Sequence, residues 1–401
     1  MTALFSLDQL LTRTIAAGSL TLVGPDAGVR RFGRGAPEVT VEIKDRNLAQ
    51  ELALAPDIAL GEAYMDGSFV IESGDIYDFF DLCFANFGHG YGHWLWRAGA
   101  MARRMQKRLA RSNSLSAAPD EISAHYDLSD ELYALFLDSE RQYSCAYYLT
   151  REDLAEQAQE HKLAHIAAKL LLRRGQRVLD IGCGWGGLAL YLARVADFEV
   201  TGLTLSQAQC DYAQKRARET GLDNRVRFAV RDYRKEAERY DRIISVGMFE
   251  HVGYGRYSEY FEKLRALLVE DGVALVGATG SAAGPGAGSP WIEKYIFPGG
   301  QAPALSEISA AVERVGLYAT DIEILRLHYA DTLRMWRRRF KDNWSRIAQI
   351  YDDRFCRMWE FYLASCEAGG RHSGLVDFHI QLARRIDAVP LTRDDLYRTS
   401  I

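Results

Sequence analysis

Short apolar runs and longer stretches with helical spacing of apolar residues alternate through the second half of the chain. The apolar runs at 177–181, 199–204, 226–231, 241–246 and 272–278 have the length of buried strands, and helical patterns lie between most of them. This alternation predicts an α/β fold built on a doubly wound parallel sheet. No internal repeat is visible in the sequence.

The first 95 residues follow another pattern, in which short alternating segments such as 39–44 mix with short helical ones. This mixture predicts a small α+β domain. Residues 112–123 are rich in Ser, Ala, Asn and Pro, which predicts a linker between an N-terminal domain over 1–111 and a second domain over 124–401. Within the second domain we expect a flexible connection at 277–288 and long helices over 331–386 that cover the site.

One segment of the N-terminal domain combines an apolar stripe with a basic face. If 94–111 is helical, Trp94, Met101 and Leu109 share one side. The other side then carries five basic residues, Arg97, Arg104, Lys107, Arg108 and Arg111. This pattern suits an anionic membrane surface, and equally a helix packed on its own protein with its basic face in solvent.

Composition narrows the classes of protein. The chain has 401 residues, of which 48% are hydrophobic, enough for two domains with an ample core. Its apolar runs are too short for a membrane span, and no signal peptide precedes Asp8. The six cysteines show no paired CxxC spacing, so we predict no metal site and expect reduced thiols in a cytoplasmic protein. A net charge of −5 gives no reason to expect nucleic acid as a partner.

The most specific chemical signal follows the strand at 177–181, where the chain reads Gly-Cys-Gly-Trp-Gly-Gly from 182 to 187 and then enters a helix over 188–195. Glycines at 182, 184 and 186 let the backbone turn tightly beside a ligand, and the helix N-terminus points into the same space. A dinucleotide dehydrogenase would carry an acidic residue at the end of its second strand. Here 204–209 reads Thr-Leu-Ser-Gln-Ala-Gln, so NAD is not expected.

These glycines, the Leu-Thr-Leu-Ser-x-x-Gln segment and the later Arg-Asp-Tyr at 231–233 resemble class I S-adenosylmethionine (SAM) methyltransferases. The resemblance implies a Rossmann-like sheet with helical cover and SAM as the cofactor. Asp232 would supply the acidic partner of the ribose or adenine edge, with Thr204 and Gln209 as neutral partners. The residues expected to bind the cofactor are Tyr143, Ser144, Asp180, Gly182, Gly184, Gly186, Thr204, Gln209, Asp232 and Tyr233.

Further motifs narrow the family. The chain reads Ala-His-Tyr-Asp-Leu-Ser at 124–129 and Gln-Tyr-Ser-Cys-Ala-Tyr-Tyr at 142–148. Later it reads Ser-Val-Gly-Met-Phe-Glu-His at 245–251, Lys-Tyr-Ile-Phe-Pro-Gly-Gly at 294–300 and Leu-His-Tyr-Ala-Asp-Thr-Leu at 327–333. From about 120 to 385 the chain therefore resembles cyclopropane-fatty-acyl-phospholipid synthases and mycolic acid methyltransferases. The region before 115, with Gly-Glu-Ala-Tyr-Met-Asp-Gly at 61–67, resembles the additional domain of the bacterial phospholipid-acting members.

The resemblance implies an enzyme that methylates the cis double bond of an unsaturated phospholipid acyl chain. Because the sulfonium methyl group is electrophilic and an alkene is a poor nucleophile, the site must align the two and exclude water. Aromatic faces and a carboxylate can stabilise the resulting carbocation. The candidates are Tyr143, Phe249, Glu250 and Tyr329. A cytoplasmic protein at the inner face of the membrane is expected, and a homodimer is left open.

Loss of a proton completes the reaction, and the resemblance implies a bound bicarbonate as the base. Cys145, Glu250 and Tyr329 match its binding positions, but Gly277 and Thr279 stand where the family has histidine and isoleucine. The missing imidazole removes a hydrogen-bonding group from this pocket. The product is therefore open between a cyclopropane and a methyl-branched or methylene chain, such as a furan fatty acid precursor. A non-catalytic lipid-binding homologue and a small-molecule methyltransferase are the alternative functions.

Overall fold

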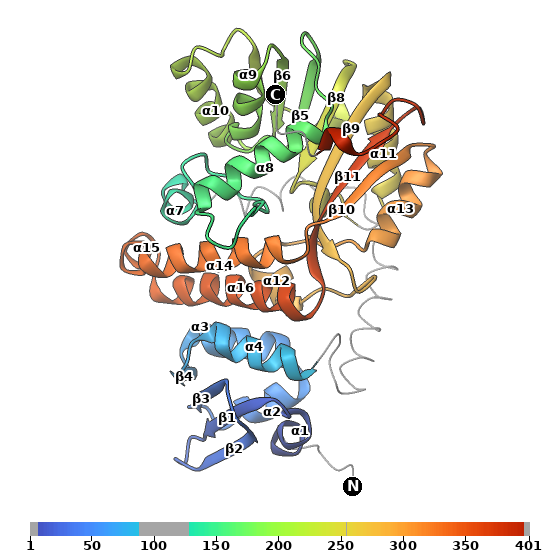
Figure 1. Ribbon diagram of the computed structural model, residues 1–401. Coiled ribbons are helices and arrows are strands. Elements are labelled where there is room, and N and C mark those ends of the chain that lie inside the picture. Colours follow the sequence, from blue (N-terminus) through green and yellow to red (C-terminus); the bar gives the residue numbers. More distant parts are fainter. Residues whose placement is uncertain (1–6, 88–127, 254, 397–401) are drawn as a thin grey trace. The chain divides into compact units, whose positions relative to one another are not determined.

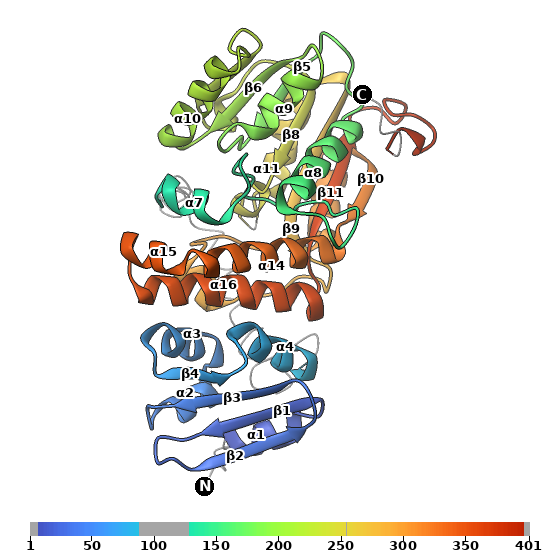
Figure 2. The ribbon, with the colours of Figure 1, turned by 60° about the vertical axis from the view of Figure 1, so that its left-hand side comes forward.

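The computed structural model describes residues 7–87, 128–253 and 255–396 (Figures 1 and 2). The chain divides into two compact units, each assembled from separate stretches of sequence. The first unit takes in 1–106, 287–298 and 333–375, and the second takes in 107–286, 299–332 and 376–401. The expected linker at 112–123 and the basic segment at 94–111 lie outside the described residues. Within the described ranges, no helix has the length and apolarity needed to cross a membrane.

The second unit is built on a seven-stranded sheet in the order β10-β11-β9-β8-β5-β6-β7. Adjacent strands from β9 to β7 run parallel, whereas β10 and β11 pair antiparallel. The five predicted strands are confirmed, and the antiparallel edge departs from the all-parallel expectation. The strands are β5 (Arg177–Ile181), β6 (Glu199–Thr204), β7 (Val226–Val230), β8 (Tyr240–Val246), β9 (Leu268–Ser281), β10 (Tyr318–Ile324) and β11 (Leu375–Ala383).

Helices cover both faces of this sheet, because its central strands bury both faces. Val178 contacts one apolar core and Leu179 the other, as side chains alternate along a strand. The first core includes α8 (Ala155–Lys169), α9 (Gly187–Val195) and α10 (Gln207–Glu219), and the second includes α11 (Tyr257–Leu267) and α13 (Leu305–Arg314). Shorter elements are α7 (Asp130–Phe136), η1 (Tyr233–Lys235), η2 (Phe249–His251) and η3 (Asp394–Leu396).

Two expectations about the last third of the chain were wrong in part. Long helices do occupy most of 331–386, namely α14 (Arg326–Asp342), α15 (Trp344–Ile350) and α16 (Asp353–His372), but 375–383 is strand β11. Its polar and apolar residues alternate with the period of a strand. The connection expected at 277–288 begins later, because β9 continues to Ser281. Gly280 lies within β9 and leaves space for the ring of Phe378.

The first unit contains a four-stranded sheet in the order β2-β1-β3-β4 and packed helices, which confirms the expected α+β character. Its strands are β1 (Gly18–Val23), β2 (Val29–Arg34), β3 (Glu38–Ile43) and β4 (Phe69–Ser73). Its helices include α1 (Leu7–Thr14), α2 (Leu48–Leu54), α3 (Pro56–Asp66), α4 (Ile76–Phe87) and α12 (Pro290–Tyr295). Helix α16 packs on α3 and α4, and Gly61 of α3 leaves space for the ring of Trp291.

Candidate functional site

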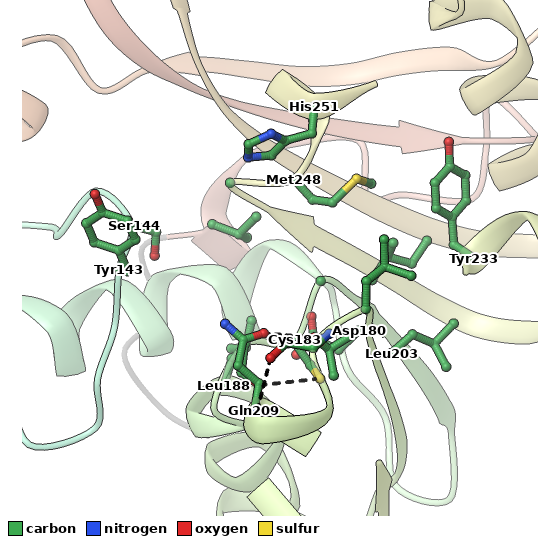
Figure 3. Close-up of a pocket in the computed structure, with 18 of the residues that line it drawn as sticks. Tyr143, Ser144, Asp180, Cys183, Leu188, Leu203, Gln209, Tyr233, Met248 and His251 are labelled. Atoms are coloured by element: carbon green, nitrogen blue, oxygen red, sulfur yellow. Dashed lines mark hydrogen bonds between the residues drawn. The ribbon is translucent and has the colours of Figure 1, made fainter. Parts of the chain in front are cut away.

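A pocket of about 290 Å³ lies in the second unit at the carboxyl ends of β5, β6 and β8. Ligands of open α/β sheets bind at this end of the strands. The turn after β5 is anchored to the neighbouring strand, since Gly182 N and Cys183 N both donate to the carbonyl of Leu203, at 2.8 and 2.9 Å. Figure 3 shows Met248 and His251 on one side of the pocket and Gln209 and Cys183 on the other.

The three glycines of this turn have positive φ angles but different surroundings. A Cβ atom on Gly182 would meet Met248 Cβ at 3.0 Å, and one on Gly186 would meet Phe228 Cζ at 2.7 Å. A Cβ on Gly184 would meet nothing within 4 Å. Gly182 and Gly184 line the pocket, whereas Gly186 begins α9 and permits packing against the sheet.

Polar side chains surround the turn. Asp180 at the end of β5 is buried, its Oδ2 accepts no hydrogen bond from any described residue, and burial raises its pKa to about 7. Thr204 donates to Gln209 Oε1 over 2.7 Å. Asp232 accepts from the guanidinium of Arg234, which lowers the pKa of that carboxyl although partial burial opposes the shift. The pocket therefore offers a ligand two carboxyl groups and neutral acceptors.

The segment at 142–144 forms another wall. Lys162 Nζ donates to Gln142 Oε1 over 2.5 Å and to Ser144 Oγ over 3.0 Å, and burial lowers the pKa of this lysine to about 8. In Figure 3 Tyr143 and Ser144 lie across the pocket from Tyr233. All the predicted cofactor-binding residues except Gly186 line this pocket. Whether they bind SAM stays a prediction.

His251 also lines the pocket, although it was not among the residues predicted to bind the cofactor. Burial lowers the pKa of its imidazole to about 4, so the ring is neutral at pH 7. A neutral ring can accept or donate one hydrogen bond to a ligand.

Glu250 lies in η2, directly after β8, and keeps some exposed surface while its Oε2 atom is buried. Its Oε1 accepts the backbone N–H of Thr279 over 2.7 Å. Desolvation raises the pKa of the carboxyl to about 7. A carboxyl with such a pKa exchanges a proton readily near neutral pH.

Two of the sequence motifs lie side by side in the second unit. Ala146 N donates to Thr332 Oγ1, and Tyr148 N donates to His328 Nδ1, each over 3.0 Å. These bonds hold Cys145 on a segment adjacent to the turn of α14 that carries Tyr329. Both residues are buried, and burial raises the pKa of the Cys145 thiol well above its usual value. The thiol is therefore protonated and not a nucleophile.

Phe249 is fully buried in the apolar core and is not among the residues that line the pocket. Its ring centroid lies 4.8 Å from that of Tyr257 and 5.0 Å from that of Tyr260. The structure thus gives this ring a packing role, and a direct part in catalysis stays a prediction. Of the five candidate catalytic residues, Tyr143 is the one that lines the described pocket.

Asp377 and His379 were missed by the sequence analysis. They follow each other on the polar face of β11 and are almost fully buried, while Val376 and Phe378 point into the apolar core. The alternation of polar and apolar residues from 375 to 383 was the signal that could have revealed them. Polar residues of α8 lie near this face, as shown by Gln381 Nε2, which donates to the carbonyl of Lys169 over 2.6 Å.

His165, Glu323 and His379 bring one potential metal-ligand atom each within 4.8 Å of one another. However, Lys169 Nζ donates to Glu323 Oε2 over 2.5 Å, and His165 Nε2 lies 2.6 Å from the same oxygen. Because an ammonium group already neutralises the only carboxylate of this set, we describe the set as a hydrogen-bonded ion-pair network.

The family model for mycolic acid cyclopropane synthetase matches residues 113–379. A probable fatty acid methyltransferase of Pseudomonas putida is 36% identical over 376 residues, covering 90% of this chain and 92% of its own. The cyclopropane-fatty-acyl-phospholipid synthase of Escherichia coli K12 is 36% identical, with 88% and 90% covered. The crystal structure of mycolic acid cyclopropane synthase CmaA1 with SAH and CTAB has a TM-score of 0.62 and 30% identity, covering 67% of this chain and 99% of that one.

Proposed function

The chain belongs to the mycolic acid cyclopropane synthetase family, and we propose that it transfers the methyl group of SAM to the cis double bond of an unsaturated phospholipid acyl chain. It is a SAM-dependent methyltransferase of the class I fold. The observation that carries the proposed substrate is the desolvated Glu250 carboxyl, two residues after pocket-lining Met248, in a chain with these lipid-modifying relatives. Methyl transfer to an oxygen or nitrogen nucleophile has no need of a group that stabilises a carbocation.

When bound, SAM supplies an electrophilic methyl group. Gly182 and Gly184 allow the backbone to approach the cofactor, and the Asp180 carboxyl provides an acceptor for its positively charged part. Tyr143 presents an aromatic ring at the pocket, where it can stabilise a cation. The Glu250 carboxylate stabilises the positive charge that develops on the acyl chain, because electrostatic interactions are strong in these desolvated surroundings.

The fate of that charge decides the product. Cyclopropane closure is the family-level expectation, and a methyl-branched or methylene chain is the second candidate. Gly277 favours the second candidate, because this position carries no side chain that could orient a base for ring closure.

Mass spectrometry of the reaction products tests the proposal. The protein is incubated with SAM and vesicles of a cis-monounsaturated phospholipid, with vesicles of the matched saturated phospholipid as the control. We expect one added carbon on the unsaturated chain alone, and no product from Glu250→Gln. Cofactor binding without methylation of any unsaturated phospholipid would favour the non-catalytic lipid-binding alternative.

We also infer that the protein associates peripherally with the anionic inner face of the cytoplasmic membrane. The support is the basic pattern at 94–111, which lies outside the described residues. Arg104→Glu with Arg108→Glu should weaken sedimentation with anionic vesicles, and salt should do the same, since surface charges are screened within about 10 Å at 0.1 M. Vesicle binding that is unaffected by the two substitutions and by salt would refute this inference.

A further inference from the structure

The carboxyl groups of Glu250 in η2 and Asp377 in β11 both contact Thr279 in the second unit. The Thr279 backbone N–H donates to Glu250 Oε1 over 2.7 Å, and its hydroxyl donates weakly to Asp377 Oδ2 over 3.4 Å. The other oxygens, Glu250 Oε2 and Asp377 Oδ1, are buried and accept no hydrogen bond from any described residue. A buried acceptor without a donor is unfavourable, so the pair favours an incoming proton or positive charge.

The charged groups near Asp377 have partners of their own. Lys162 Nζ donates to Gln142 and Ser144, and Lys169 Nζ donates to Glu323. Among the described residues of this unit, neither ammonium group therefore donates a hydrogen bond to Asp377. The titratable groups that face this strand are Lys162, His165 and Lys169 from α8, Glu250 from η2, Glu323 from β10, His379 from β11 and the Cys145 thiol.

His379 lies beside the position where the family resemblance implied a different histidine. A Cβ atom on Gly277 would meet His379 Cδ2 at 3.4 Å, so the imidazole of β11 occupies the space next to this glycine of β9. His379 Nε2 lies 4.0 Å from Asp377 Oδ1. Burial lowers the pKa of His379 well below its usual value, so the ring is neutral and cannot neutralise Asp377 as an imidazolium.

Further titratable groups lie between Asp377 and the protein surface. The rings of His379 and His165 are stacked with their centroids 6.0 Å apart, and His165 Nε2 lies 2.6 Å from Glu323 Oε2. The Glu323 side chain is 32% exposed. Titratable groups thus succeed one another from a buried carboxylate to one that contacts solvent.

The bicarbonate that the resemblance implied does not fit these residues. A bicarbonate has one O–H donor and otherwise offers acceptors, whereas Glu250 Oε2 and Asp377 Oδ1 are acceptors that already lack donors. Placing an anion beside these two carboxyl groups would oppose their ionisation in a desolvated place, where electrostatic interactions are strong. The chain carries instead a carboxylate of its own at this point.

We propose that Asp377 is the base that removes the proton from the methylated acyl chain, in place of a bound bicarbonate. This inference rests on the proposed function. As the C–S bond breaks with its electron pair on sulfur, the alkene π electrons form the new C–C bond and leave a carbocation. A C–H bond of that cation then gives its proton to Asp377 Oδ1, and its electron pair closes the ring or forms a double bond. Asp377 then gives the proton up to solvent before the next turnover.

The test compares Asp377→Asn with wild-type protein on cis-monounsaturated phospholipid vesicles in buffer freed of carbon dioxide. General base catalysis contributes roughly 10²- to 10⁴-fold, so we expect kcat to fall at least about 100-fold. The affinity for SAM, measured by calorimetry, should be unchanged. Because Asp377 must be deprotonated to act as a base, the wild-type kcat should rise with pH, and this rise should be lost in Asp377→Asn. Formate should partly restore the activity of Asp377→Ala.

Asp321→Asn is the matched control, since Asp321 is a buried carboxylate of the adjacent strand β10 that pairs with Arg393. It should keep both kcat and its pH profile. Added bicarbonate should leave the wild-type rate unchanged. A wild-type rate that depends on bicarbonate, or an Asp377→Asn variant within threefold of wild type, would overturn the inference while leaving the proposed function intact. If wild-type protein methylates no unsaturated phospholipid, the proposed function itself fails.

Discussion

At the scale of single residues, the glycine turn shows why one motif can serve two purposes. Gly184 lines the pocket and has open space around its Cα, whereas Gly186 is enclosed by Phe228 and Ala213. The sequence predicts the turn and its position, because three glycines follow an apolar strand. It does not separate the glycine that faces a ligand from the one that packs, since that difference depends on Ala213 and Phe228, which are distant in the sequence.

Gly184→Val should therefore abolish SAM binding while the protein stays folded. The side chain would occupy the space that the ligand needs, and the positive φ angle adds strain of roughly 1–2 kcal/mol. Gly175→Val is the control, because Gly175 also has a positive φ angle and open surroundings but does not line the pocket. Titration calorimetry measures the affinities, and an unchanged affinity in folded Gly184→Val would remove this turn from the cofactor site.

Gly186→Ala should instead lower the stability of the protein. Its new Cβ would lie 2.7 Å from Phe228 Cζ and 2.8 Å from Ala213 Cβ, closer than atoms in contact allow. Such overpacking costs about 1–3 kcal/mol, and the positive φ angle adds to it. Thermal unfolding without ligand measures the effect. A midpoint equal to that of wild type would mean that α9 and β7 shift apart at little cost.

At the scale of elements, the sequence predicts β5 to β9 well, because each is an apolar run between helical patterns. It failed at β11, although buried Asp, His and Gln alternate there with apolar residues at the period of a strand. Pairing with β10 makes β11 part of the sheet, and α8 lies near its polar face; a local sequence pattern does not show such long-range contacts. The same pairing explains why Asp377 and His379 escaped prediction although Glu250 and Cys145 did not.

The buried carboxyls should make stability depend on pH. Burial raises the pKa of Asp377 to about 8 from an ordinary value near 4. The folded state therefore retains a proton that the unfolded state loses, so the free energy of unfolding falls as pH rises from about 4 to about 8. Asp377→Asn should raise stability at pH 8 by roughly several kcal/mol, at about 1.4 kcal/mol for each pKa unit, and change it little at pH 4. Denaturant unfolding at both pH values checks this, and an equal effect at both would contradict it.

The contact between the Cys145 segment and α14 can be tested through Thr332, whose hydroxyl accepts the N–H of Ala146 over 3.0 Å. Thr332→Val keeps the shape of the side chain but leaves a buried N–H without a partner, which costs about 1–3 kcal/mol. We expect reduced stability and a lower kcat. Thr332→Ser keeps the hydroxyl and should behave much like wild type. Equal stability of the valine and serine variants in thermal unfolding would show that this bond contributes nothing.

At the scale of the whole molecule, the first unit is not a continuous N-terminal domain. Phe361 of α16 packs against Phe80 and Trp291, with ring centroids 4.9 and 4.5 Å apart, and Tyr64 donates a hydrogen bond to Glu360. Three stretches of chain thus share one core. A sequence read from one end to the other suggests a boundary after residue 111, because it cannot show that later helices return to the same core.

Deleting residues 1–111 should therefore do more than remove a domain. It would uncover the apolar face of α16 and remove the hydrogen bond that Tyr64 donates to Glu360. It would also remove Asp75, which pairs with the buried guanidinium of Arg337 over 3.1 Å. We expect the shortened chain to aggregate, as proteins with newly exposed apolar patches do. Phe361→Ala in the full chain perturbs the same core less severely and should lower the free energy of unfolding by about 3–5 kcal/mol. Size-exclusion chromatography and thermal unfolding distinguish the outcomes. A monomeric shortened protein that binds SAM as tightly as the full chain would show that α14 to α16 need no partner from the N-terminal stretch.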